Sequence, residues 1–260
     1  MTTFAALLDQ AHHGALELPG SWLQGRTAFG GLQAGALVAR ARREAGGRPL
    51  RALMTAFVGP AAEGPATVDA ELLRAGGSSS QVQARLIQGD ALCATALALF
   101  GAPRAGQPSY GDPAPFQALP PDALAELPQI PGVTPVFTQH FDYRWAEGQP
   151  PFSAADSSAI GGWIRFREPP AALGAEALLA LLDAWPVPVL STFRAPGPAS
   201  SVTWHAQLFD VGELDPGEHL AYRGRTTAGS DGYVDAQAEL RTADGRLVVT
   251  STQSVAIYHP

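Results

Sequence analysis

Apolar and polar residues alternate along many stretches of the chain, the pattern of β-strands that bury one face. In the first half these stretches lie near residues 21–26, 51–58, 67–75, 79–88 and 91–100. In the second half they lie near residues 138–146, 160–167, 200–209, 219–228, 231–242 and 245–257. Turns containing Asp90 and Asp244 separate the last two strands of the two halves, so each half is predicted to end in a hairpin.

Two further segments have no polar face and are predicted to form buried helices. The first spans residues 29–44 and carries no charge from Phe29 to Ala39. The second spans residues 171–185, and Glu176 is the one charge in its first eleven residues. Because a helix that is apolar on every side must be covered on every side, both are expected inside the fold. The small Gly and Ala residues of the first helix would allow a sheet to wrap closely around it.

The order of these elements repeats. Each half has one helix and a long antiparallel sheet, and residues 92–95 align without a gap on residues 247–250. This order indicates an α+β fold rather than alternating βαβ units, and two buried helices wrapped by two sheets describe a double hotdog. Residues 101–135 contain nine prolines and are predicted to be a linker or surface strap with a short helical turn. The predicted organisation is therefore residues 1–100, the linker at 101–135, and residues 136–260.

Composition narrows the class of protein. Of the 260 residues 46% are hydrophobic and 16% charged, as in a globular protein, and the net charge is −7. All 17 basic residues are arginine and form no basic stripe, which argues against nucleic acid and anionic membranes as partners. The first residues lack a signal peptide pattern, and no uncharged run approaches the ~18 residues of a membrane helix. We expect a cytoplasmic protein from a GC-rich bacterial genome, with its single cysteine, Cys93, buried in the core.

Several segments in order resemble type II acyl-CoA thioesterases, the TesB-like members of the double-hotdog superfamily. They are "FGG-Q" at the first helix, "VDAELLRAGGSSSQVQARL", "GGWIRFREPP", "LLDAWP", "SVTWHAQLF" and "DGRLVVTSTQSVAIY". The resemblance covers nearly the whole chain and is weakest in the linker. It implies hydrolysis of an acyl-CoA thioester in lipid metabolism, without metal or organic cofactor. It also implies an apolar tunnel between the halves for the acyl chain.

Asp183 is the strongest candidate for chemistry. It ends the run "LLALLD" among apolar neighbours and lies in the last turn of a predicted helix. Burial disfavours a carboxylate, and so does the negative end of a helix dipole. Both effects would raise the pKa of Asp183, which suits a general base. The alternative is an ordinary surface aspartate, and the resemblance favours the catalytic role.

The resemblance places two partners beside Asp183. Gln253 lies inside the last strand, where the family has a glutamine that orients the attacking water; its counterpart in the first half is Ala98. The family also has a threonine near the start of the "SVTWHAQLF" strand. Ungapped matching puts Ser201 there instead, with Thr203 as the other candidate. Strict alternation places Ser201, Thr203 and His205 on one face of this strand.

The adjacent Gly30 and Gly31 begin the first helix. Glycines before a helix often bind phosphate, but no lysine followed by Ser/Thr and no βαβ unit accompany them. They are interpreted first as positions where a sheet or helix packs closely. Their N–H groups are a second candidate, as donors to a substrate carbonyl.

Other functions stay open. The chain has no G-x-S-x-G motif, and its six histidines have no zinc-binding spacing such as H-E-x-x-H. One alternative is a non-catalytic double hotdog that binds an acyl or aromatic ligand. Another is a hydrolase for a different pantetheine-linked acyl carrier. A dehydratase is disfavoured because neither predicted helix contains histidine. Association into a homo-oligomer is a further expectation.

Overall fold

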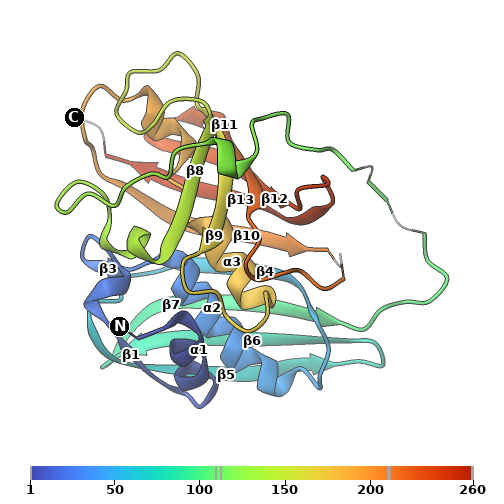
Figure 1. The fold of residues 1–260 in the computed structure, drawn as a ribbon. Helices are drawn as coiled ribbons and strands as arrows, with labels where there is room; N and C mark the ends of the chain where they lie inside the picture. The colour runs from blue at the N-terminus through green and yellow to red at the C-terminus, as the bar shows by residue number, and fades with distance from the viewer. Residues whose placement is uncertain (1, 109, 112, 210–211, 259–260) are drawn as a thin grey trace.

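Two helix-containing halves share one sheet in the computed structural model, which describes residues 2–108, 110–111, 113–209 and 212–258 (Figure 1). Eleven strands pair in the order β1-β5-β6-β7-β4-β10-β13-β12-β11-β9-β8, and every neighbouring pair in this order is antiparallel. The strands of the first half are β1 Ala15–Leu18, β4 Leu50–Phe57, β5 Gly64–Ala75, β6 Ser79–Gln88 and β7 Ala91–Gly101. Those of the second are β8 Phe141–Glu147, β9 Ala159–Phe166, β10 Ala199–Leu208, β11 Leu220–Ser230, β12 Tyr233–Arg241 and β13 Leu247–Ile257.

The halves are joined where β4 pairs with β10. Trp204 lies opposite Thr55 in this pairing, and the sheet continues through it without a break. The helices are α1 Phe4–His12, α2 Gly30–Ala41 and α3 Ala175–Asp183. A separate two-stranded sheet is formed by β2 Leu23–Gln24 and β3 Thr27–Ala28. Short 3₁₀ turns occupy Gly20–Trp22, Arg42–Glu44, Pro121–Ala123, Val136–His140 and Pro188–Thr192.

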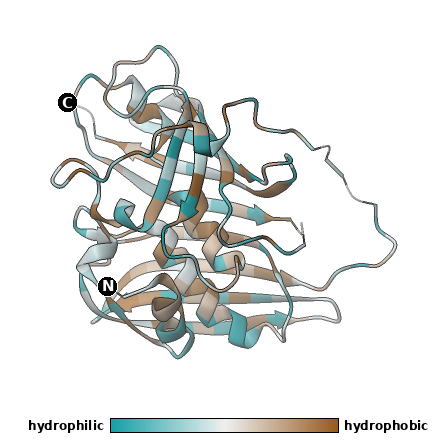
Figure 2. Ribbon diagram, viewed as in Figure 1, coloured by the Kyte–Doolittle hydropathy of each residue, from teal (hydrophilic) through white to brown (hydrophobic). Residues whose placement is uncertain are grey.

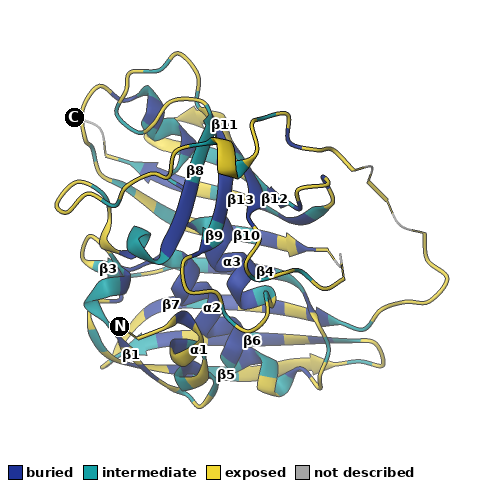
Figure 3. Ribbon diagram, viewed as in Figure 1, coloured by how far each residue is buried: buried dark blue, intermediate teal, exposed yellow. Residues whose placement is uncertain are grey.

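The helices α2 and α3 form the centre of the core. They are mainly apolar or neutral in Figure 2 and mostly buried in Figure 3. They approach closely at Gly31, where an added Cβ would lie 2.8 Å from the Cα of Ala180. Arg42 reaches across with two bonds to Glu176, at 2.7 and 3.0 Å. Two central helices against one antiparallel sheet confirm the predicted α+β double hotdog.

The proline-rich linker packs against the outer face of the second half. Leu127 donates its N–H to the carbonyl of Tyr143 on β8 at 3.0 Å. The indole of Trp163 donates to the carbonyl of Leu119 at 2.9 Å, and the Phe116 ring lies 5.4 Å from that of Trp163. The later part of the linker is therefore a strap on the sheet, while its first part extends away from the body (Figure 1).

The beginning of the chain differs from the sequence prediction. A strand was expected at 21–26, but a 3₁₀ turn and the short β2 stand there, followed by Gly25 with φ +66°. Trp22 is buried and stacks on the ring of His140 at 3.8 Å, so tertiary packing overrides the local alternation. The prediction also omitted α1 and β1. The signal for α1 was present, since Thr3 caps it and its buried positions have helical spacing.

The segment Ala175–Thr192 passes a test of length and composition for a membrane-spanning helix. Core helices of soluble proteins pass the same test. Here α3 ends at Asp183 and contacts α2, and the 3₁₀ turn Pro188–Thr192 is a separate element. We therefore interpret the segment as part of the core.

The buried position of α2 gives a measurable expectation. We expect the amides of residues 32–39 to be among the slowest in the protein to exchange with deuterium, because α2 opens only when the core opens. Mass spectrometry of peptides from this helix measures the rate. Exchange as fast as in the 101–115 part of the linker would contradict a helix enclosed by the sheet.

Candidate active site

The carboxylate of Asp183 lies at the start of α2. Asp183 is the last residue of α3, and its side chain crosses to the other half of the molecule, where the N–H of Gly31 donates to it. An added Cβ at Gly30 would lie 2.7 Å from Oδ2 of Asp183. The first N–H groups of a helix need acceptors, and Phe29, which precedes α2, supplies no side-chain cap. Asp183 therefore acts as a capping acceptor from the second half.

Burial controls the protonation of Asp183. Removal from water raises the pKa of this carboxyl to about 7, and the bond from Gly31 lowers it by a smaller amount. Of the two causes expected from the sequence, burial is the dominant one. Two helix ends act on Asp183. The C-terminus of α3 disfavours its negative charge, whereas the N-terminus of α2 faces the same carboxylate and favours its charged form. The group can gain and lose a proton near neutral pH.

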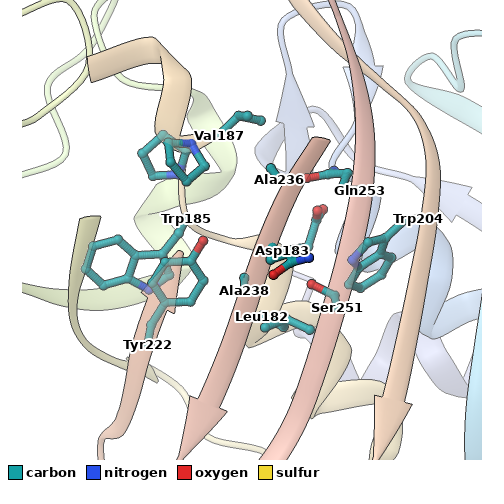
Figure 4. Close-up of a pocket in the computed structure, with 13 residues that line it drawn as sticks. Leu182, Asp183, Trp185, Val187, Trp204, Tyr222, Ala236, Ala238, Ser251 and Gln253 are labelled. Atoms are coloured by element: carbon teal, nitrogen blue, oxygen red, sulfur yellow. The ribbon is translucent and has the colours of Figure 1, made fainter. Parts of the chain in front are cut away.

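A small cavity adjoins Asp183. Its volume is about 20 Å³, enough for about one water molecule. Figure 4 shows Asp183 between the rings of Trp185 and Tyr222 on one side and Trp204 on the other. The lining residues are Leu182, Asp183, Trp185, Pro186, Val187, Pro188, Trp204, Tyr222, Ala236, Gln237, Ala238, Ser251 and Gln253. All belong to the second half, and the cavity is too small for an acyl chain, unlike the expected tunnel.

Gln253 borders this cavity and is tied to Ser201. Its Nε2 donates to the Ser201 hydroxyl. Gln253 lies opposite Trp204 in the pairing of β13 with β10, which places both on the face that is turned to α3. Asp183 and Gln253 therefore line the same cavity, and Ser201 contacts Gln253 from outside its lining; the catalytic roles of the three residues stay predictions.

Thr203 is separated from this group. The register of β10 against β13 shifts between Ser201 and Thr203, the mark of a β-bulge, and Thr203 then pairs with Ser254. Thr203 is exposed, whereas Trp204 is buried on the inner face. The expectation that Ser201 and Thr203 share a face was wrong, because strict alternation does not allow for the bulge. Of the two hydroxyl candidates, Ser201 is the one that contacts Gln253.

Gly30 leaves space for the carboxylate of Asp183, and Gly31 allows α2 and α3 to pack closely. At Gly31 an added Cβ would meet the ring of Phe29 at 2.5 Å as well as the backbone of α3. Both positions lack room for a side chain, as the packing interpretation expects. The N–H of Gly31 is already bonded to Asp183. Direct contact of Gly30 and Gly31 with substrate stays a prediction.

Three lining residues were not singled out from the sequence. Trp185 and Tyr222 have parallel rings with centroids 4.7 Å apart, and Ser251 is buried two residues before Gln253. The position of Trp185, two residues after Asp183, was a usable signal. Tyr222 had no such signal, because it lies 39 positions after Asp183 on a strand whose neighbours are known only from the fold.

The described parts of the chain contain no cluster of side chains that could bind a metal ion. No group of three His, Cys, Asp or Glu side chains there is arranged to hold an ion. Cys93 is a free, buried thiol on β7, and burial raises its pKa, so it is disfavoured as a nucleophile.

Comparison with protein families decides the relationship. Residues 18–101 match the acyl-CoA thioesterase N-terminal domain, and residues 121–257 match the acyl-CoA thioesterase C-terminal domain. The chain belongs to the acyl-CoA thioesterase family. None of the curated proteins matches its sequence.

Solved structures agree with this fold. A hot dog protein of unknown function from Alicyclobacillus acidocaldarius is 23% identical with a TM-score of 0.84, over 97% of this chain and 98% of that one. A proposed thioesterase II from Thermobifida fusca is 24% identical with a TM-score of 0.83, over 100% and 98%. Acyl-CoA thioesterase II TesB2 from Mycobacterium marinum is 21% identical with a TM-score of 0.71, over 89% and 90%. At these identities the likeness establishes the fold of this family member.

The raised pKa of Asp183 predicts a stability gain on its replacement. Between pH 3.8 and about 7, Asp183 keeps its proton in the folded protein and loses it in the unfolded chain. The contribution of Asp183 to the free energy of unfolding therefore falls as the pH rises. The asparagine of Asp183→Asn still accepts from Gly31 but never ionises. We expect this variant to be more stable than wild type at pH 8, by up to about 4 kcal/mol.

Urea unfolding from pH 4.5 to 8.5 measures the difference, which should shrink toward acid pH. Asp156→Asn, at an exposed position, is the control and should show little change. A difference for Asp183→Asn that is the same at every pH would contradict a raised pKa.

Proposed function

We propose that this protein hydrolyses acyl-CoA thioesters to a free acid and coenzyme A. The observation that carries the proposal is Asp183, a buried carboxyl with a pKa of about 7 beside a cavity for about one water molecule. A general base works best when its pKa is close to the working pH. Membership of the acyl-CoA thioesterase family supplies the substrate class.

Hydrolysis follows from this arrangement without a covalent intermediate. Ionised Asp183 accepts a proton from the water while the water oxygen forms a bond to the thioester carbonyl carbon. The carbonyl electron pair moves to its oxygen and then returns as the C–S bond breaks. The proton on Asp183 passes to the sulfur of the leaving thiol. In this scheme Gln253, itself held by Ser201, orients the water.

The small volume of the cavity limits how substrate enters. At about 20 Å³ it has room for the attacking water but not for the acyl group, so side chains around Asp183 must move when substrate binds. Pro186 and Pro188 follow α3 directly, and Val187 between them lines the cavity. We propose that the segment of these three residues moves to admit the acyl group.

The main alternative is a double hotdog that binds an acyl or aromatic ligand without reacting. A buried carboxyl that is ionised at neutral pH destabilises the fold, and a neutral residue would serve a binding site better. The presence of Asp183 at this buried position therefore favours hydrolysis. A different pantetheine-linked carrier is the second alternative, and a thioester assay with several carriers separates it. We further propose a cytoplasmic bacterial role in lipid metabolism; association into a homo-oligomer stays a prediction.

A thiol-release assay over a series of acyl-CoA chain lengths tests the proposal. We expect wild type to release thiol and Asp183→Asn to lose at least about 100-fold in kcat. Because the reaction needs the carboxylate, kcat/KM should rise with pH to a plateau with a midpoint near 7. Ser201→Ala should lower kcat through the loss of its contact with Gln253.

Thr203→Ala is the matched control. It removes a hydroxyl two residues away on the same strand, on the exposed side of the bulge, and should leave kcat close to that of wild type. Equal background rates for wild type and Asp183→Asn, together with measurable acyl-CoA binding, would refute hydrolysis and support a ligand-binding protein. A larger loss in Thr203→Ala than in Ser201→Ala would refute the assignment of Ser201.

A further inference from the structure

The proposed hydrolysis also needs a hydrogen-bond donor for the thioester carbonyl oxygen, and no residue has yet been assigned to this role. As water attacks, negative charge develops on the thioester carbonyl oxygen, and hydrogen-bond donors that face this oxygen lower the barrier. The N–H of Gly31, the expected donor at the start of α2, is bonded to Asp183. The Nε2 of Gln253 is bonded to Ser201. Among the described residues, the lining also offers the indole N–H of Trp185, which is buried without a partner, and the hydroxyl of Tyr222.

Tyr222 on β11 fits this requirement. Its side chain lines the same cavity as Asp183 and is 3% exposed. Among the described residues its hydroxyl has no hydrogen-bond partner. Figure 4 shows this hydroxyl on the end of the ring that is turned toward Asp183. A substrate carbonyl in the cavity would give this hydroxyl an acceptor.

The ring of Tyr222 is held in this orientation from two directions. One face stacks on Trp185, with the rings parallel and their centroids 4.7 Å apart. Gly224 follows two residues later on the same face of the strand, where an added Cβ would lie 2.4 Å from the Tyr222 hydroxyl oxygen. The absence of a side chain at Gly224 therefore makes room for the hydroxyl.

Tyr143 on β8 provides an internal comparison. It is also buried, and its ring also contacts Trp185, with centroids 5.7 Å apart. Its hydroxyl, however, donates to the carbonyl of Ala184 at 2.9 Å. Tyr143 therefore stabilises the end of α3, whereas the hydroxyl of Tyr222 stays free to bind. Burial and the nearby charge of Asp183 both raise the pKa of Tyr222, so its proton is retained at neutral pH.

We propose that Tyr222 is a further catalytic residue, whose hydroxyl donates to the thioester carbonyl oxygen as Asp183 activates the water. This inference rests on the proposed hydrolysis. Water forms the new C–O bond, Asp183 takes its proton, and Tyr222 keeps its own proton while it stabilises the oxyanion. When the C–S bond breaks, the carbonyl reforms and the hydrogen bond from Tyr222 weakens.

Steady-state kinetics of Tyr222→Phe test this role, with Tyr143→Phe as the matched control. We expect Tyr222→Phe to lower kcat by about 100-fold with little change in KM, because the bond is strongest in the transition state. Its stability to urea should equal or exceed that of wild type, since no protein contact is lost. Tyr143→Phe should show the opposite pattern, with reduced stability and kcat within about threefold of wild type.

Two more variants keep the outcome decisive. Gly224→Ala keeps the tyrosine but displaces its ring and hydroxyl, so it should also lower kcat. Ser251→Ala removes the other buried hydroxyl at the cavity and should have the smaller effect. A kcat for Tyr222→Phe within threefold of wild type, or a larger loss in Ser251→Ala, would overturn the proposal. Wild type that releases no thiol from any acyl-CoA would instead refute the proposed hydrolysis.

Discussion

The bond between the N–H of Gly31 and the carboxylate of Asp183 connects the two halves where the chemistry is proposed. It requires the end of α3 to meet the beginning of α2. That meeting is possible because Gly30 has no side chain to displace the carboxylate and Gly31 has none to push α2 away from Ala180. The continuous sheet through β4 and β10 holds the halves in the same relation. Each half alone would lack one side of this contact.

The same contact balances two opposing effects on the charge of Asp183. Burial favours the protonated acid, whereas the N-terminus of α2 favours the carboxylate. The result is a pKa of about 7, high for an aspartate but low enough for the ionised form to exist at neutral pH. The site is thus less stable than a neutral core would be, as is typical of positions retained for chemistry.

Most of the fold followed from periodicity in the sequence. The alternating stretches gave ten of the strands of the large sheet, and the uncharged runs gave α2 and α3, because burial on one or all faces leaves a clear pattern. Asp183 was found because an acidic residue interrupts an apolar run. Ser201 and Gln253 came from resemblance to the thioesterase family.

The remaining features depend on contacts that no local pattern carries. The bulge near Val202 separates Ser201 from Thr203, and only the pairing with β13 reveals it. The acceptor for the start of α2 is a residue about 150 positions away. Tyr222 reaches the cavity because β11 lies between β12 and β9 in the sheet and because Gly224 leaves room for the hydroxyl. The volume of the cavity is likewise set by how Trp185, Tyr222 and Trp204 pack.

The most direct test of this account is the titration of Asp183 itself. Carbon NMR of protein labelled at the aspartate side-chain carboxyl carbons, assigned by comparison with Asp183→Asn, follows its protonation from pH 3 to 9. We expect a midpoint near 7 for Asp183. A midpoint near 4, the ordinary value for an aspartate, would contradict the central claim that this carboxyl is a buried base.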